Sequence, residues 1–151
     1  AHKKQTGSVV NFHEAQTIPH AELLTSACDV LIPAALENQL TQENAADVKA
    51  QVVFELANGP TTPEADDLLF ARGVHVVPDI LANSGGVTVS TYEWEQNLKR
   101  EHWSEADVFQ KLEANMKEQG AHMWEAAGRA KTDLRRGAFL VALDRIEKAM
   151  R

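Results

Sequence analysis

Three apolar runs recur at nearly even spacing in the first half of the chain. They are Asp29 to Ala35, Gln51 to Ala57 and Val74 to Ile80. Each run is continuous rather than alternating, which is typical of strands that are buried on both faces of a parallel sheet. The pattern therefore predicts three parallel strands.

Two helical segments with readable ends lie between these runs. Thr41 is placed to cap a helix that runs to about Lys49, and Thr62 is placed to cap a second helix that begins at Pro63. Gly73 marks the end of the second helix. The order strand, helix, strand, helix, strand predicts two right-handed βαβ crossovers.

Further helices are predicted on both sides of this region. A short one over residues 19–26 leads into the first strand, and the chain reads as helical from residue 87 to its end. A helix over about residues 87–98 comes first, Ser104 opens a second, and Thr132 or Asp133 caps the last. The C-terminal part is therefore expected to be mainly helical.

The expected fold class is α/β, with a partial doubly wound parallel sheet of about three strands and flanking helices on both faces. Residues 6–86 would form the βαβαβ part, and residues 87–151 the helical segment. The length of 151 residues suits one domain with a core of its own.

The net charge of -7 disfavours a nucleic-acid or anionic membrane partner, because both would be repelled. The densest basic group is interrupted by an aspartate and lies in a helical region, which indicates a solvated helix face. Its members are Arg129, Lys131, Arg135 and Arg136. No apolar run approaches the roughly 18 residues of a membrane span, so a cytoplasmic protein is expected.

The single cysteine, Cys28, excludes an internal disulfide and a multi-cysteine metal site. It is expected to pack as a small apolar residue where the first strand starts. The six histidines form no pair at metal-ligand spacing on a predicted helix. No metal site is predicted.

Two predicted strands end in an asparagine beside backbone-permissive residues. Asn58 opens Asn-Gly-Pro, and Asn83 opens Asn-Ser-Gly-Gly. Either motif is also readable as an ordinary turn or loop. Because each follows a strand and precedes a helix, their amides and backbone N–H groups would meet at one sheet edge, where open α/β folds bind ligands. That position favours a binding site.

Two small residues, Ala34 and Ala35, end the first predicted strand. They leave room for a flat ligand against the backbone, and they equally suit helix–sheet packing. The chemistry alone leaves both interpretations open.

The stretches 32–38, 57–66 and 78–90 closely resemble the nucleotide-binding domain of the glutamate dehydrogenases, whose sheet is Rossmann-like. The longest shared string is Ala-Asn-Gly-Pro-Thr-Thr-Pro-Glu-Ala-Asp, and the resemblance runs from about residue 6 to the C-terminus. Strings of this length are far more specific than a lone glycine pattern. For Ala34 and Ala35 at the end of the first predicted strand, the resemblance favours the interpretation that they contact a cofactor.

The resemblance implies specific contacts for six residues. The residues matched to cofactor contacts are Ala34, Ala35, Asn58 and Asn83, and the cofactor is NAD or NADP. Asn58 would lie at the nicotinamide-side ribose or the nearby phosphate. Asn83, Val87 and Ser90 would contact the substrate, with the Ser90 hydroxyl reaching the side-chain carboxylate.

The activity implied by the resemblance is the reversible oxidative deamination of L-glutamate to 2-oxoglutarate and ammonia by a homo-oligomer. However, the chain holds no Gly-x-Gly-x-x-Gly pattern, and the family's catalytic lysine and aspartate belong to an upstream domain. No catalytic residue is therefore assigned within the chain. We expect the C-terminal portion of a dinucleotide-binding domain, inactive alone. The rival is a non-catalytic truncated module that binds nucleotide weakly or packs on partner subunits.

The sequence leaves the choice between NAD and NADP open, because the residues that distinguish them follow an earlier strand in this family. Two local departures from the family pattern lie close to the predicted site. Leu56 stands where a glycine is more frequent, and Ser84 stands where alanine is usual. The side chain of Leu56 affects how closely the backbone near Asn58 can approach a cofactor.

Overall fold

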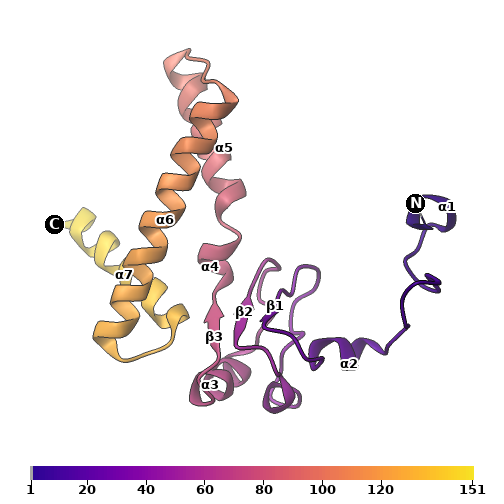
Figure 1. The fold of residues 1–151 in the computed structure, drawn as a ribbon. Coiled ribbons are helices and arrows are strands. Elements are labelled where there is room, and N and C mark those ends of the chain that lie inside the picture. The colour runs from indigo at the N-terminus through magenta and orange to yellow at the C-terminus, as the bar shows by residue number, and fades with distance from the viewer. Residues whose placement is uncertain (1) are drawn as a thin grey trace.

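The computed structural model describes residues 2–151 and shows a three-stranded parallel sheet beside long helices (Figure 1). The strands, in the spatial order β1-β2-β3, are β1 (Val30–Leu31), β2 (Val52–Phe54) and β3 (His75–Val77). The α-helices are α1 (His2–Thr6), α2 (His20–Leu24), α3 (Pro63–Ala71), α4 (Asp79–Ala82), α5 (Gly85–Lys99), α6 (Glu105–Ala130) and α7 (Leu134–Met150). The predicted α/β class, parallel sheet and helical C-terminal segment are confirmed.

The central strand carries the core on one face of the sheet. Val53 is fully buried, pairs in register with Leu31 and Val76, and packs with Leu69 of α3. In β3, Val76 lies on the same face of the sheet as Val53. Because side chains alternate along a strand, the next residue, Val77, points to the opposite face. It packs against the helices α6 and α7, so β3 is covered on both faces.

The prediction that all three strands are buried on both faces is wrong for β1. The side chains of Val30 and Ile32 are 48% and 51% exposed, whereas Leu31 between them packs against the core. The physical reason is position, since α3, α6 and α7 pack at the β3 end of the sheet. Cys28 is also exposed rather than packed, because it precedes the start of β1.

The helix predicted over residues 41–49 is also wrong, since only a single 3-10 turn, η1 (Ala45–Asp47), forms there. Local side-chain bonds replace helical ones: the Asn44 amide oxygen accepts from the Thr41 backbone N–H at 2.9 Å. The Arg72 guanidinium then binds the backbone carbonyls of Ala45 and Val48 at 2.5 and 2.7 Å. The crossover between β1 and β2 is therefore an irregular connection.

The remaining helix ends agree well with the sequence. The Thr62 hydroxyl caps α3 by accepting from the Ala65 N–H at 3.3 Å, and Pro63 is the first residue of the helix. Ser104 caps α6 and Asp133 caps α7 in the same way. The helix expected from about residue 87 starts earlier, at Gly85.

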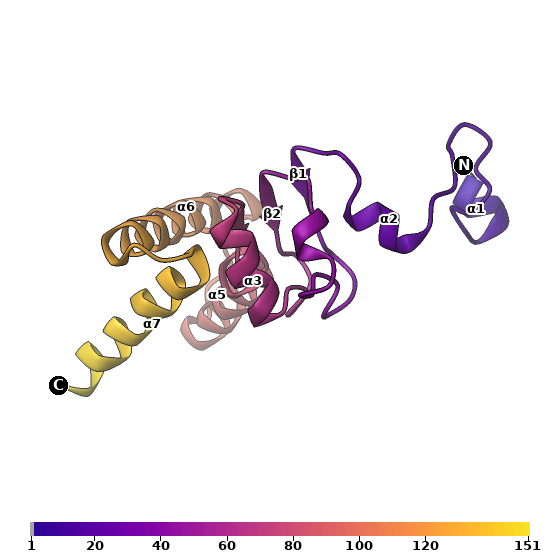
Figure 2. The same cartoon turned by 90° about the horizontal axis from the view of Figure 1, so that it is seen from below.

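The helices α5, α6 and α7 form the tall part of the molecule, with α5 and α6 side by side and α7 folding back along the lower half of α6 (Figure 1). The close approach of α6 and α7 depends on Gly137. A Cβ atom at that position would lie 2.8 Å from both the Ala127 Cβ and the Met123 carbonyl oxygen. Figure 2 shows that α1 lies at the far end of an extended segment, away from the sheet. None of the described helices combines the length and apolarity that crossing a bilayer requires.

The β1 edge of the sheet is open among the described residues, because β1 pairs only with β2, whereas α3 and α7 pack at the other edge strand, β3. An apolar strand with unpaired N–H and C=O groups tends to pair with another chain. We expect the 151-residue chain to dimerise through β1, and light scattering at rising concentration measures this. Ile32→Lys, which places a charge beside the edge, should shift the chain to monomer. A strict monomer at all concentrations would contradict the prediction.

Candidate functional site

The predicted strand-end segments lie side by side at the carboxyl end of the sheet. The Pro33 carbonyl accepts from the backbone N–H groups of Leu56 and Ala57 at 3.0 and 2.9 Å, which extends the pairing of β1 and β2. The exposed residues Ala34 and Ala35 follow directly. The segment that ends β1 therefore runs beside the one that leads to Asn58.

The two asparagines singled out from the sequence are in direct contact, and we call them the amide pair. The Asn83 side-chain NH₂ donates to the Asn58 side-chain oxygen at 2.7 Å. It also lies 3.3 and 3.4 Å from the Leu56 and Ala57 carbonyls. Within residues 2–151, the Asn58 NH₂ and the Asn83 side-chain oxygen have no further partner, so one donor group and one acceptor remain free for a ligand.

The turn after Asn58 is fixed from two sides. Gly59 has a φ of +54°, a left-handed conformation that glycine adopts without strain, and its N–H donates to the Asp79 carboxylate at 2.8 Å. The Gly59 carbonyl accepts from the Asn38 N–H at 2.9 Å. The turn is thus held by groups from both neighbouring strand ends.

The other predicted substrate residues lie on one side of α5. Val87 and Ser90 are three residues apart in α5, so they share a face, and the Val87 side chain is 66% exposed. Asn83 precedes α5 as the C-terminal cap of α4. The opposite side faces α6, where the Ser84 hydroxyl is 3.5 Å from the Met116 sulfur. The Ser90 hydroxyl donates to the Gly86 carbonyl at 3.1 Å, so it must exchange this partner to bind a ligand.

Three carboxylates surround one guanidinium beneath the amide pair, a group we call the Arg135 cluster. Arg135 donates from Nε to Asp66 at 2.5 Å, from Nη1 to Asp79 at 3.0 Å and from Nη2 to Glu55 at 2.7 Å. Glu55 has no solvent exposure, and the Arg135 side chain is 21% exposed. The prediction of a solvated helix face is therefore wrong for Arg135, because the second residue of α7 points into the sheet end.

The neighbouring Arg136 does fit that prediction, since its side chain is 57% exposed while it pairs with Asp67 and Asp133. Sequence reasoning missed the Arg135 cluster because its partners lie 56 to 80 residues away along the chain. A signal was present, however. Glu55 and Asp79 are carboxylates inside two apolar runs, and a buried carboxylate needs a cation or hydrogen-bond donors beside it.

The Arg135 cluster contains more acidic groups than basic ones, since one guanidinium faces three carboxyl groups. Burial raises the pKa of Asp66 above its ordinary 3.8, and the hydrogen bond and charge of Arg135 offset this only in part. One Asp66 oxygen is buried and has no partner among residues 2–151. Burial would lower the pKa of Arg135, but its bonds to Glu55 and Asp66 more than reverse this and raise it.

The raised pKa of Asp66 makes the folding free energy depend on pH. Between 3.8 and its higher folded-state pKa, the folded chain holds a proton that the unfolded chain has lost. This stabilisation is complete below 3.8 and disappears as the pH rises through the folded value. We expect the free energy of unfolding, measured in urea from about pH 4 to about pH 8, to lose this decrease with rising pH in Asp66→Asn. Asp67→Asn, at an exposed neighbour, should leave it in place, and an unchanged slope in Asp66→Asn would contradict the prediction.

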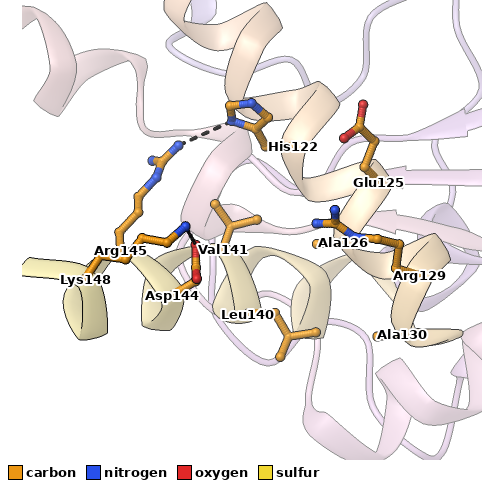
Figure 3. Close-up of a pocket in the computed structure, with 10 residues that line it drawn as sticks. All are labelled: His122, Glu125, Ala126, Arg129, Ala130, Leu140, Val141, Asp144, Arg145 and Lys148. Atoms are coloured by element: carbon orange, nitrogen blue, oxygen red, sulfur yellow. Dashed lines mark hydrogen bonds and ion pairs between the residues drawn. The ribbon is translucent and has the colours of Figure 1, made fainter.

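A wide hollow of about 730 Å³ lies elsewhere, between α6 and α7 (Figure 3). Some of its polar groups bind one another: Arg145 lies 3.4 Å from His122, and Lys148 pairs with Asp144 at 2.6 Å. It is remote from the strand ends in sequence and contains none of the predicted site residues. In residues 2–151, no group of three His, Cys, Asp or Glu side chains could hold a metal ion.

The fold and these contacts define an α/β domain with a polar edge at the carboxyl ends of its strands. The family model of the Glutamate/Leucine/Phenylalanine/Valine dehydrogenases matches residues 1–151. The chain belongs to this family.

Two curated relatives differ in their cofactor. The chain is 47% identical over 143 residues to the NADP-specific glutamate dehydrogenase of Synechocystis, covering 95% of this chain and 33% of that protein. It is 45% identical over 145 residues to the NAD-specific glutamate dehydrogenase of Staphylococcus aureus, covering 96% of this chain and 35% of that protein. The chain thus spans about a third of the length of the curated relatives that it matches.

Solved structures show the same fold. The hetero-hexameric glutamate dehydrogenase of Thermus thermophilus, in a leucine-bound form, matches with a TM-score of 0.87 and 34% identity, covering 98% of this chain and 35% of that one. The glutamate dehydrogenase of Peptoniphilus asaccharolyticus matches with a TM-score of 0.76 and 46% identity, covering 79% and 30%.

Proposed function

We propose that the chain supplies the nicotinamide-side half of the cofactor site, and part of the substrate site, of an NAD- or NADP-dependent glutamate dehydrogenase. The observation that carries this proposal is the amide pair at the ends of β2 and β3 in a chain of this family. The reaction would be the reversible conversion of L-glutamate to 2-oxoglutarate and ammonia, in which the bound nicotinamide supplies the hydride acceptor.

The residues present fit one half of the cofactor. The free NH₂ of Asn58 and the free amide oxygen of Asn83 offer a donor and an acceptor, which suit a carboxamide or ribose hydroxyls. The small side chains of Ala34 and Ala35 leave their backbone accessible beside them. The phosphate-binding glycine loop has no counterpart in these 151 residues, so the proposal assigns them no contact with the adenosine half.

The chain's own residues would bind and orient the reactants. Asn58 and Asn83 would hold the nicotinamide side in place, while Val87 provides an apolar wall for the substrate carbon chain. Ser90 would donate its hydroxyl to the distal carboxylate. No side chain among these residues is assigned a proton-transfer role, so the 151-residue chain is proposed to be inactive alone.

The proposed assembly is a homo-oligomer. Apolar side chains that are exposed in the structure recur at helical spacing on one side of α7. They are Leu140, Leu143, Ile146 and Met150. A stripe of this kind favours packing on another protein surface. It equally supports the second candidate function, a module that packs on partner subunits without catalysis.

A chimera tests the proposal. Residues 1–151 would replace the matching third of the Synechocystis enzyme, and Asn58→Ala would be introduced into the active chimera. We expect a rise of about tenfold in the KM for the cofactor, because one ligand hydrogen bond is lost. Asn97→Ala, at an exposed position near the end of α5, is the control. An unchanged cofactor KM and kcat in Asn58→Ala would reject the cofactor site and leave the packing module.

The substrate assignment is tested by Ser90→Ala in the same chimera. We expect kcat/KM for L-glutamate to fall about ten- to a hundredfold, because a hydrogen bond to a carboxylate is worth about 1.5 to 3 kcal/mol. The cofactor KM should stay constant. Norvaline lacks the distal carboxylate, so its kcat/KM should not fall. An equal loss for both substrates would contradict the role of Ser90.

A further inference from the structure

We infer that Arg135 is a positioning residue for the amide pair: it fixes Asn58 and Asn83 relative to each other through Asp79 and Glu55. This inference rests on the proposed function, since it concerns the same site. Arg135 itself contacts neither asparagine. Its effect is transmitted by two short chains of hydrogen bonds.

The first chain leads to Asn58. Arg135 Nη1 donates to one oxygen of Asp79 at 3.0 Å, and the other oxygen of Asp79 accepts from the Gly59 N–H at 2.8 Å. Gly59 directly follows Asn58 and is held in a left-handed conformation. The direction in which the Asn58 side chain leaves the turn is therefore set by the position of the Asp79 carboxylate.

The second chain leads to Asn83. Arg135 Nη2 donates to one oxygen of Glu55 at 2.7 Å, and the other oxygen of Glu55 accepts from the Asp79 backbone N–H at 2.8 Å. Asp79 is the first residue of α4, a single helical turn whose C-terminal cap is Asn83. Fixing the first residue of so short a helix also fixes its last.

Burial of the Arg135 cluster holds the start of both hydrogen-bond chains in place. Glu55 is fully buried, and Asp66 anchors the guanidinium from α3 through its third direction. A planar guanidinium with donors in three directions meets three carboxylates, from the segment after β2, from α3 and from α4, a geometry that a lysine ammonium cannot reproduce. Arg135 thus links α7 to the ends of β2 and β3.

The test measures the amide pair without any cofactor, by hydrogen exchange and side-chain amide NMR on the full 151-residue chain. The variant is Asp79→Asn, which keeps the volume but removes the charge and leaves a single acceptor oxygen, so that Gly59 and Arg135 can no longer both donate to this side chain. We expect Gly59 amide exchange to rise about tenfold to a hundredfold, because one charge-assisted hydrogen bond is lost. The Asn58 and Asn83 side-chain resonances should shift, while the β3 amides keep their protection.

Two matched controls use the exposed neighbours. Asp67→Asn changes the same residue type opposite Arg136, and it should leave Gly59 unchanged. Arg135→Lys keeps the charge and should raise Gly59 exchange, whereas Arg136→Lys should not. The inference is overturned if Gly59 in Asp79→Asn exchanges as in the parent chain. It is also overturned if protection falls evenly over the whole chain, since that would indicate a purely structural role.

A final measurement separates this inference from the proposed function. In the chimera, Asp79→Asn should raise the cofactor KM about tenfold and spare kcat for bound substrate. If Gly59 loosens while the cofactor KM is unchanged in Asp79→Asn but raised in Asn58→Ala, the positioning role is overturned and the proposed function stands. If neither variant changes the cofactor KM, the proposed function fails.

Discussion

Purified residues 1–151 are expected to reduce neither NAD nor NADP measurably in the presence of L-glutamate. By resemblance, the lysine and aspartate that move protons in this family have no counterpart in these residues. Proton transfer alone contributes about 10² to 10⁴ in rate, and the loss of positioning adds to that. The formation of reduced nicotinamide, followed by its absorbance, measures the effect.

The chimera with the Synechocystis enzyme provides the positive control, because it restores the other two thirds of a complete relative. Its activity would show that the residues of this chain are competent in context. Turnover by the isolated chain within about a thousandfold of the chimera would contradict the expectation, since it would require proton-transfer groups within these 151 residues.

Replacement of Arg135 by methionine is expected to lower the free energy of unfolding by about 3 to 5 kcal/mol. The physical reason is that Glu55, Asp66 and Asp79 would remain without their shared cation, and Glu55 has no access to water. Urea unfolding followed by circular dichroism measures the change in stability.

The adjacent Arg136→Met is the matched control, because its guanidinium lies at the surface and pairs with the exposed Asp67. Its other partner, Asp133, is buried but keeps the hydrogen bond from the Arg136 backbone N–H. Exposed ion pairs contribute about 1 kcal/mol or less, so this loss should be small. Equal losses in the two variants would show that the buried cluster contributes no more than a surface pair.

The parts of the fold that depend on local chemistry could be predicted from the sequence. Thr62, Pro63 and Gly73 delimit α3 because caps and breakers act within a few residues. The same reasoning failed at residues 41–49, where Asn44 binds the Thr41 backbone and Arg72 binds two carbonyls from a distant helix. A helical pattern there competes with one local side-chain bond and with two long-range bonds from Arg72 that no short window of sequence contains.

For the candidate site, too, the features that depend on local sequence could be predicted and those that depend on long-range contacts could not. That Asn58 and Asn83 lie near each other could be predicted, because the ends of neighbouring parallel strands meet at one edge. The helical turn α4 between β3 and Asn83 was not predicted. The role of Arg135 could not, since its three partners come from the segment after β2, from α3 and from α4. The burial of β1 was wrongly predicted because an apolar run indicates what a strand could bury and not which elements pack on it.

The hydrogen bond between Gly59 and Asp79 also bears on how long the site survives chemically. An asparagine followed by glycine deamidates when the glycine backbone nitrogen attacks the asparagine side-chain carbonyl carbon and ammonia leaves. In this chain that nitrogen donates its hydrogen to Asp79, and the Asn58 amide is held by Asn83. Both reacting groups must give up a hydrogen bond before the attack, so the contacts that orient the amide pair are expected also to slow the deamidation that would replace Asn58 by a carboxylate.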